Sequence, residues 1–251
     1  LRFSGTATQV EQAFGTELSR VSLPSGRSAR VATKAASVPA AFGPAVAGVL
    51  GLSTLARAAS SIRRSPSANV VPSSGASPRR AASRTSGSLR PRACADATVA
   101  AHGGGPYNLP DMQGLTDQEI AWSYGMGGLY RAQANGLGQR IAVFELEHFG
   151  ASDVATFSDC YFGQDLSSQI NVTSVSGGVS PGTVSAGEAT LDVEDALGLA
   201  PGAQIDVYEG PNTDLGVVST YNQIVEDDAA KAITTSWGLC EASASIPASE
   251  E

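Results

Sequence analysis

The clearest pattern of apolar and polar positions lies in the C-terminal half of the chain, where short apolar runs alternate with helical periodicity. Apolar runs bounded by turn residues predict buried strands, and apolar residues three and four positions apart predict helices. Strand, helix and strand repeated with short connections predict a parallel sheet with helices on both faces. In chain order we expect a helix at 117–134, a strand at 141–144, a helix at 152–162 after a serine cap, a strand at 170–175, a loop at 177–187, a helix at 188–199, a strand at 205–208, a helix at 215–230 and a strand at 232–237.

The N-terminal part of the chain predicts a small α+β unit. Thr8 precedes a helical pattern and has Glu11 three positions later, which is the spacing of a capping box. Residues 18–33 alternate like two strands around a turn at Pro24. Residues 39–52 mix apolar residues with glycines and predict a short broken helix or a loop.

Between these parts the composition changes. Residues 53–106 set eight arginines among Ser, Pro, Ala and Gly, a mixture that predicts a disordered linker. The paired Arg63-Arg64 and Arg79-Arg80 suit proteolytic processing, although they would equally serve as solubilising charge. We therefore expect three segments: the end of a small domain at 1–52, a linker at 53–106 and the start of an α/β domain at 107–251.

The composition limits the classes of protein to which this chain can belong. With 251 residues, of which 42% are apolar, the chain can bury a core. No uninterrupted apolar run is long enough for a transmembrane helix, so we expect a soluble protein that does not enter membranes.

The net charge of −8 hides a separation of the two signs. Up to Arg92 there are 13 Lys and Arg against two Glu, a net charge of +11, whereas from residue 93 onward there are three against 22 Asp and Glu, a net charge of −19. Such separation is typical of a nucleic-acid-binding tail or of two segments that attract each other. Because the basic part holds one lysine and few aromatic residues, we favour a basic segment that serves the acidic domain.

Cysteine and histidine are scarce. Cys94, Cys160 and Cys240 form no C-x-x-C pair, and there are two histidines, His102 and His148. This content disfavours a zinc site and a Ser-His-Asp triad. Two of the cysteines would pair in an exported protein, whereas all three would be core residues in a cytosolic one.

The best candidate for chemistry is a pair of carboxylates. Glu188 and Asp192 stand four positions apart in the expected helix at 188–199, so both project from the same face. Two like charges at this spacing cost a few tenths of a kcal/mol, part of which the helix dipole offsets at Glu188. If the pair is partly buried, it shares a proton and can deprotonate a nucleophile at acid pH. The alternative is a solvated helix face.

Five segments, in one order along the chain, resemble the sedolisins, which are serine-carboxyl peptidases on a subtilisin-like fold, and within them the kumamolisin-like members with an N-terminal activation domain. The matching segments are VEQAFGT at 10–16, VAGVLGL at 46–52, GQRIAVFEL at 138–146, GEATLDVEDALGLAPGAQIDVY at 187–208, and SWG at 236–238 with Glu241.

The resemblance implies roles for individual residues. Glu188 would be the general acid/base that deprotonates the nucleophilic serine, and Asp192 would hydrogen-bond and orient it. Glu145 and Trp237 would extend this network, although Glu145 at a strand end could instead face solvent and Trp237 could merely pack. Carboxylates suit acid chemistry, because an imidazole with an ordinary pKa near 6.5 is protonated at pH 4.

The same resemblance implies parts that this sequence lacks. It contains no Gly-Thr-Ser for the nucleophile, no Gly-Asp for the oxyanion aspartate and no calcium loop. We therefore expect an inactive fragment of a secreted, acid-acting serine-carboxyl endopeptidase zymogen. Its partners would be a protein or peptide substrate and its own pro-region, with no nucleic acid or membrane. No metal site is expected within these residues, and calcium only in the full-length family member.

Two other functions remain open from the sequence. The chain could be a truncated, non-catalytic sedolisin-like module that binds or inhibits. A nucleotide-binding α/β module would need a phosphate loop, and the glycines at 103–105 and 125–128 lack the strand-turn-helix context.

Three disulfide pairings are possible. We expect Cys94 to bond Cys160, which would tie the start of the mature domain to the helix at 152–162. Cys240 would then pair outside these residues.

Overall fold

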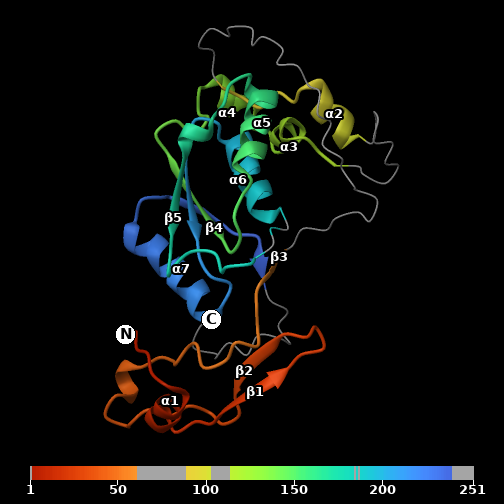
Figure 1. The fold of residues 1–251 in the computed structure, drawn as a ribbon. Helices are drawn as coiled ribbons and strands as arrows, with labels where there is room; N and C mark the ends of the chain where they lie inside the picture. Colours follow the sequence, from red (N-terminus) through yellow and green to blue (C-terminus); the bar gives the residue numbers. More distant parts are fainter. Residues whose placement is uncertain (1, 61–88, 103–113, 184, 186, 239–251) are drawn as a thin grey trace.

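The computed structural model describes residues 2–60, 89–102, 114–183, 185 and 187–238. Figure 1 shows a small N-terminal unit in red and orange, from which an extended segment runs to a larger α/β unit. The paired arginines, Cys240 and Glu241 lie outside the described residues.

The N-terminal unit consists of a helix and a hairpin. Helix α1 (Ala7–Phe14) is followed by the antiparallel strands β1 (Leu18–Ser22) and β2 (Ser28–Ala32), and the loop after them contains one 3-10 turn, η1 (Gly43–Ala45). The expected cap at Thr8 is wrong: Thr6 caps α1 through a capping box with Gln9. Thr6 lies one residue before the helix, where its hydroxyl reaches the Gln9 amide, whereas Thr8 is already inside the first turn.

The α/β unit is built on a four-stranded sheet in which every neighbouring pair of strands is parallel. The strand order is β5-β6-β4-β7. Because parallel strands need crossover connections, a helix lies between each strand of this sheet and the next one in the sequence. Its elements are α3 (Asp117–Ser123), α4 (Gly127–Arg131), β4 (Arg140–Glu145), α5 (Ala151–Phe162), η2 (Ser167–Gln169), β5 (Ile170–Ser174), α6 (Glu188–Leu199), β6 (Gln204–Glu209), α7 (Asp214–Asp227) and β7 (Ala232–Thr234).

Both faces of the sheet are covered. Val143 of β4 packs on Val193 of α6 in one core cluster, and its neighbour Phe144 points to the other face, where Ile224 of α7 belongs to a second cluster. Figure 1 shows α5 and α6 on one side of the strands and α7 on the other. Because β4 is buried on both faces, its sequence is a continuous apolar run rather than an alternating one. The expected α/β fold with a subtilisin-like parallel sheet is confirmed.

Three local expectations are wrong. The single helix at 117–134 is two helices, α3 and α4, because Gly125 between them adopts a left-handed φ of 70°. Helix α5 begins after Gly150, with no side-chain cap from Ser152. The strand at 232–237 ends at Thr234, and a short strand β8 (Trp237–Gly238) follows it.

Both described ends of the 53–106 segment carry secondary structure. At its start, strand β3 (Ala59–Ser60) pairs with β8 of the α/β unit. At its end, helix α2 (Ala95–Ala101) lies beside α3, and Ala97 packs against the core cluster of α5 and α6. Within the described ranges, no helix is long and apolar enough to cross a bilayer.

Candidate active site

The structure brings four of the expected site residues together at the carboxyl end of the parallel sheet. Glu145 is the last residue of β4, Glu188 is the first residue of α6, and Asp192 follows one turn later. Trp237 opens β8, just beyond the end of β7. In open α/β sheets this edge is where ligands and chemistry are found, because several strand ends converge there.

The two carboxylates of α6 are buried rather than solvated. Glu188 is 2% exposed and Asp192 is 8% exposed. Glu188 Oε2 accepts a 2.5 Å hydrogen bond from the hydroxyl of Ser60, and Asp192 Oδ1 accepts a 2.7 Å hydrogen bond from the hydroxyl of Ser236. The solvated-face alternative for this pair is therefore excluded.

Glu145 is a third buried carboxyl group of the site, next to Asp192. It is fully buried, and its Oε2 accepts a 2.8 Å hydrogen bond from Trp237 Nε1. Glu145 and Asp192 each shift the pKa of the other's carboxyl group, so the two groups interact. Glu145 Oε1 and Asp192 Oδ2 are buried and have no hydrogen-bond partner in the described part of the chain. Two interacting carboxyl groups in a buried site favour the state in which one of them is protonated.

The proton of this pair resides on Glu145. Burial raises the pKa of Glu145 to about 9, and the charges of Asp192 and Glu147 add to this against the opposing Trp237 bond. Burial also raises the pKa of Asp192, but the hydrogen bonds from Ser236 and Glu145 oppose that shift. At neutral pH, Glu145 is thus protonated beside Asp192.

A strand of the N-terminal segment lies across this site. β3 pairs antiparallel with β8, with Ala59 opposite Gly238 and Ser60 opposite Trp237. Just before it, the Asn212 side chain binds the backbone of Ala58 twice, donating to the carbonyl at 2.8 Å and accepting from the amide at 2.9 Å. An extended segment is therefore held along β8, with the Ser60 hydroxyl hydrogen-bonded to Glu188.

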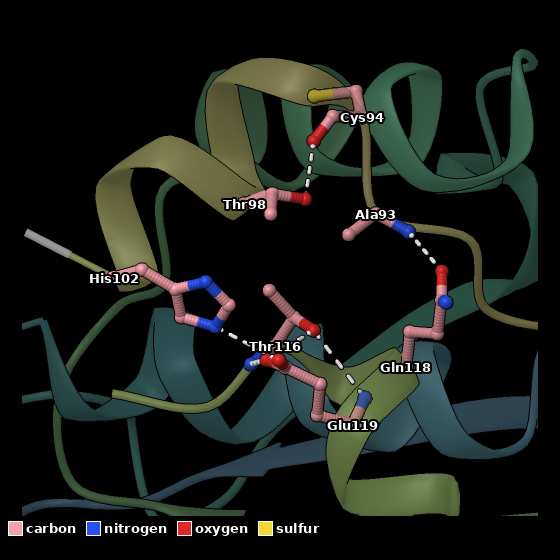
Figure 2. Close-up of polar contacts among 7 residues, drawn as sticks. All are labelled: Ala93, Cys94, Thr98, His102, Thr116, Gln118 and Glu119. Carbon is pink, nitrogen blue, oxygen red and sulfur yellow. Dashed lines mark hydrogen bonds and ion pairs between the residues drawn. The ribbon is translucent and has the colours of Figure 1, made fainter. Parts of the chain in front are cut away.

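The cysteine pair lies on the far side of the α/β unit. Cys94 and Cys160 form a disulfide that joins the start of α2 to α5. Figure 2 shows the polar contacts that accompany it: the Ala93 amide donates to Gln118 Oε1 at 3.1 Å, and His102 Nε2 lies 2.8 Å from Glu119 Oε1. The segment entering the α/β unit is thus fixed covalently and by hydrogen bonds to α3.

Two contacts of the site were missed from sequence. Ser236 stands next to Trp237, so its place in the same segment could have indicated a role. Ser60 gave no signal, because it lies in a serine-rich stretch 128 positions before its partner.

The described residues do not fit a metal ion. Among the ranges that the structure describes, no group of three or more His, Cys, Asp or Glu side chains is arranged to hold one. His148 instead pairs with Glu209 at 2.8 Å.

Comparison with known proteins gives two matches. Residues 1–55 match the family described as pro-kumamolisin, activation domain. Kumamolisin from Bacillus sp. (strain MN-32) is 30% identical over 244 residues, which cover 94% of this chain and 37% of kumamolisin. The chain thus spans little more than a third of that relative's length.

The chain thus combines a subtilisin-like α/β sheet with a segment that matches the activation domain of pro-kumamolisin. Over 94% of its own length, the chain is similar to kumamolisin, a member of the sedolisins.

Proposed function

We propose that this chain supplies the activation segment and part of the active site of a secreted, acid-acting serine-carboxyl endopeptidase that is made as a zymogen. The observation that carries the proposal is the contact between Ser60 and Glu188. A buried carboxylate oxygen that accepts a hydrogen bond from one serine hydroxyl at 2.5 Å has the geometry to take the proton of another.

Each member of the network has a distinct task in this reaction. Glu188 accepts the proton of the nucleophilic serine as its oxygen attacks the scissile carbonyl carbon, and then gives that proton to the leaving amine. Asp192 orients Glu188 from the next turn of α6. Glu145 remains protonated and donates to Asp192, and Trp237 fixes the Glu145 carboxyl.

The nucleophile and the oxyanion aspartate would come from elsewhere. The 251 residues contain neither a Gly-Thr-Ser nor a Gly-Asp segment. We place both groups in a part of the polypeptide outside these residues, so the 251 residues alone would be inactive. No step of the proposed reaction involves calcium.

The segment around β3 would be the natural inhibitor of the site. A strand that pairs antiparallel with β8 occupies the edge on which a peptide substrate would form backbone hydrogen bonds. Its serine covers Glu188 at the same time. The enzyme would be inactive until this segment leaves.

Secretion is part of the proposal. Disulfides persist in oxidising compartments and are rare in the cytosol, and Cys94 is bonded to Cys160. An acid endopeptidase acting outside the cell would meet protein or peptide substrates there.

Charge would contribute to release. None of the four ion pairs between described side chains joins residues 2–60 to the α/β unit, so attraction between the two would act through their opposite net charges. Protonation of carboxylates toward pH 4 weakens that field. In the processed zymogen, the activation segment should co-elute with the enzyme at pH 7 and separate at pH 4, and salt should promote separation. Unchanged co-elution across this range would remove the electrostatic trigger.

The decisive test of function begins with the coding DNA downstream of Glu251, where an in-frame Gly-Thr-Ser is expected. The full-length zymogen, incubated at pH 4, should then hydrolyse a denatured protein. Glu188→Gln should lower kcat by about 10²–10⁴-fold. Asp159→Asn, an exposed position on α5, is the control and should change kcat less than about twofold. A wild-type zymogen without hydrolysis between pH 3 and 6 would overturn the proposal and favour the binding module.

A further inference from the structure

Helix α6 begins without a cap of its own, although it carries both carboxylates of the proposed site. Its N-cap residue is Gly187, with a left-handed φ of 94° and no side chain to accept a hydrogen bond. The first amides of a helix have no partner within the helix, so a buried helix start needs an acceptor from elsewhere. Glu188 is the first residue of this turn and is itself buried.

Glu147 supplies that acceptor from a different part of the fold. It lies two residues beyond the end of β4 and is 1% exposed. Its Oε1 accepts hydrogen bonds from the Gly187 amide at 2.9 Å and from the Ala189 amide at 3.2 Å, and the Ser185 hydroxyl lies 3.4 Å away. The two amides that flank Glu188 therefore converge on one carboxyl oxygen, and the Gly187 amide also donates to the Ser185 hydroxyl oxygen at a longer 3.2 Å.

This arrangement fixes the direction of Glu188. The amides of Gly187 and Ala189 define the backbone on either side of Glu188, and the Cα–Cβ direction of a helical residue follows from its backbone. Catalytic groups must be held within about 0.5 Å of the productive geometry, and a misplacement of about 1 Å can cost about 10²-fold in rate. A helix start that frays by one turn would move Glu188 much farther.

We propose that Glu147 is a positioning residue for Glu188, which it holds by accepting the hydrogen bonds of the two amides around it. The proposal rests on the proposed function for its effect on catalysis. Glu147 does not touch the reacting groups; it acts through the start of α6.

The variants that test this separate the acceptor from the volume of the side chain. Glu147→Gln keeps an oxygen acceptor, whereas Glu147→Met keeps a similar volume but has only a weakly accepting thioether sulfur. In the full-length zymogen after activation, Glu147→Met should lower kcat by about 10–100-fold with KM within about twofold, and Glu147→Gln should retain kcat within about threefold. Equal kcat values for the two variants would overturn the proposal.

A second capping glutamate provides the matched control. Glu119 accepts from the Thr116 amide at 2.9 Å at the start of α3, away from the carboxyl network. Glu119→Met should lower the melting temperature but leave kcat unchanged. A loss of kcat equal to that of Glu147→Met would show that general destabilisation explains both.

Hydrogen exchange tests the contact without relying on activity. In the wild-type zymogen the Gly187 and Ala189 amides should be protected, because both donate to a buried acceptor. Glu147→Met should accelerate exchange in residues 187–192, and Glu147→Gln should not. A wild-type protein with no peptidase activity would contradict the proposed function. Unchanged amide exchange rates in Glu147→Met would contradict the positioning role of Glu147.

Discussion

Glu145 at the end of β4 and Asp192 on α6 form a pair of buried carboxyl groups, and burial raises the pKa of both. The proton that Glu145 binds in the folded protein keeps two negative charges from lying side by side. The pair therefore links the state of the site to pH.

The first prediction concerns Glu145→Gln. The pKa of Glu145 is raised to about 9 in the folded protein, so the folded state binds this proton more tightly than the unfolded chain. The free energy of unfolding should therefore fall as pH rises from about 4.3 toward 9. Glu145→Gln donates to Asp192 without titrating, so denaturant unfolding should show a weaker decline. At pH 4 its kcat should stay within about threefold of wild type; a loss of 100-fold would mean that Glu145 transfers the proton during turnover.

The second prediction concerns Trp237→Phe. The change removes the indole donor and leaves Glu145 Oε2 buried without its bond, which should lower the free energy of unfolding by about 1–3 kcal/mol. Trp122→Phe is the control, because Trp122 is 48% exposed and should change stability by less than about 0.5 kcal/mol. Equal effects in urea titrations would contradict a role for the indole hydrogen bond.

The third prediction concerns the hydrogen bonds that hold the activation segment on the α/β unit. Asn212→Ala removes both hydrogen bonds to the Ala58 backbone, and Ser60→Ala removes the hydroxyl on Glu188. Both should shorten the lag before activity appears when the zymogen is brought to pH 4, and neither should change kcat of the activated enzyme. An unchanged lag in the double variant would mean that other contacts hold the segment.

The fourth prediction concerns a second buried carboxyl pair, far from the sheet edge. Burial raises the pKa of Asp117 to about 8, and Asp195 adds to this by its charge and by accepting a hydrogen bond from the Asp117 carboxyl. Because the raised pKa belongs to the folded state, stability should fall between about pH 4 and 8. Asp117→Asn keeps a donor to Asp195 and should be more stable than wild type at pH 8, with a smaller difference at pH 4. A constant difference across this range in thermal unfolding would count against the shared proton.

The α/β unit was largely predictable because its signals are local. The 188–199 helix was predicted with the observed bounds, since a glycine loop precedes it and Pro201 follows it. The split at Gly125 was missed because one left-handed residue interrupts a helix without changing the periodicity around it.

The site was predictable only where a motif preserved it. Glu188 and Asp192 were found from their helical spacing and from the resemblance, and Glu145 and Trp237 through the resemblance alone. The structure places all four at the carboxyl end of the sheet. The contacts of Ser60 and Glu147 join elements far apart in the chain, and no spacing rule connects them.

The disulfide determines which piece of the chain stays covalently attached to the α/β unit after a cut between Ser60 and Leu89. Cys94 anchors the downstream piece to α5, while β3 keeps only its noncovalent contacts. A tethered inhibitor acts at a fixed local concentration, whereas a severed one obeys mass action. On the proposed function, dilution after such a cut would release β3 from Glu188, and peptidase activity would rise as the protein concentration falls.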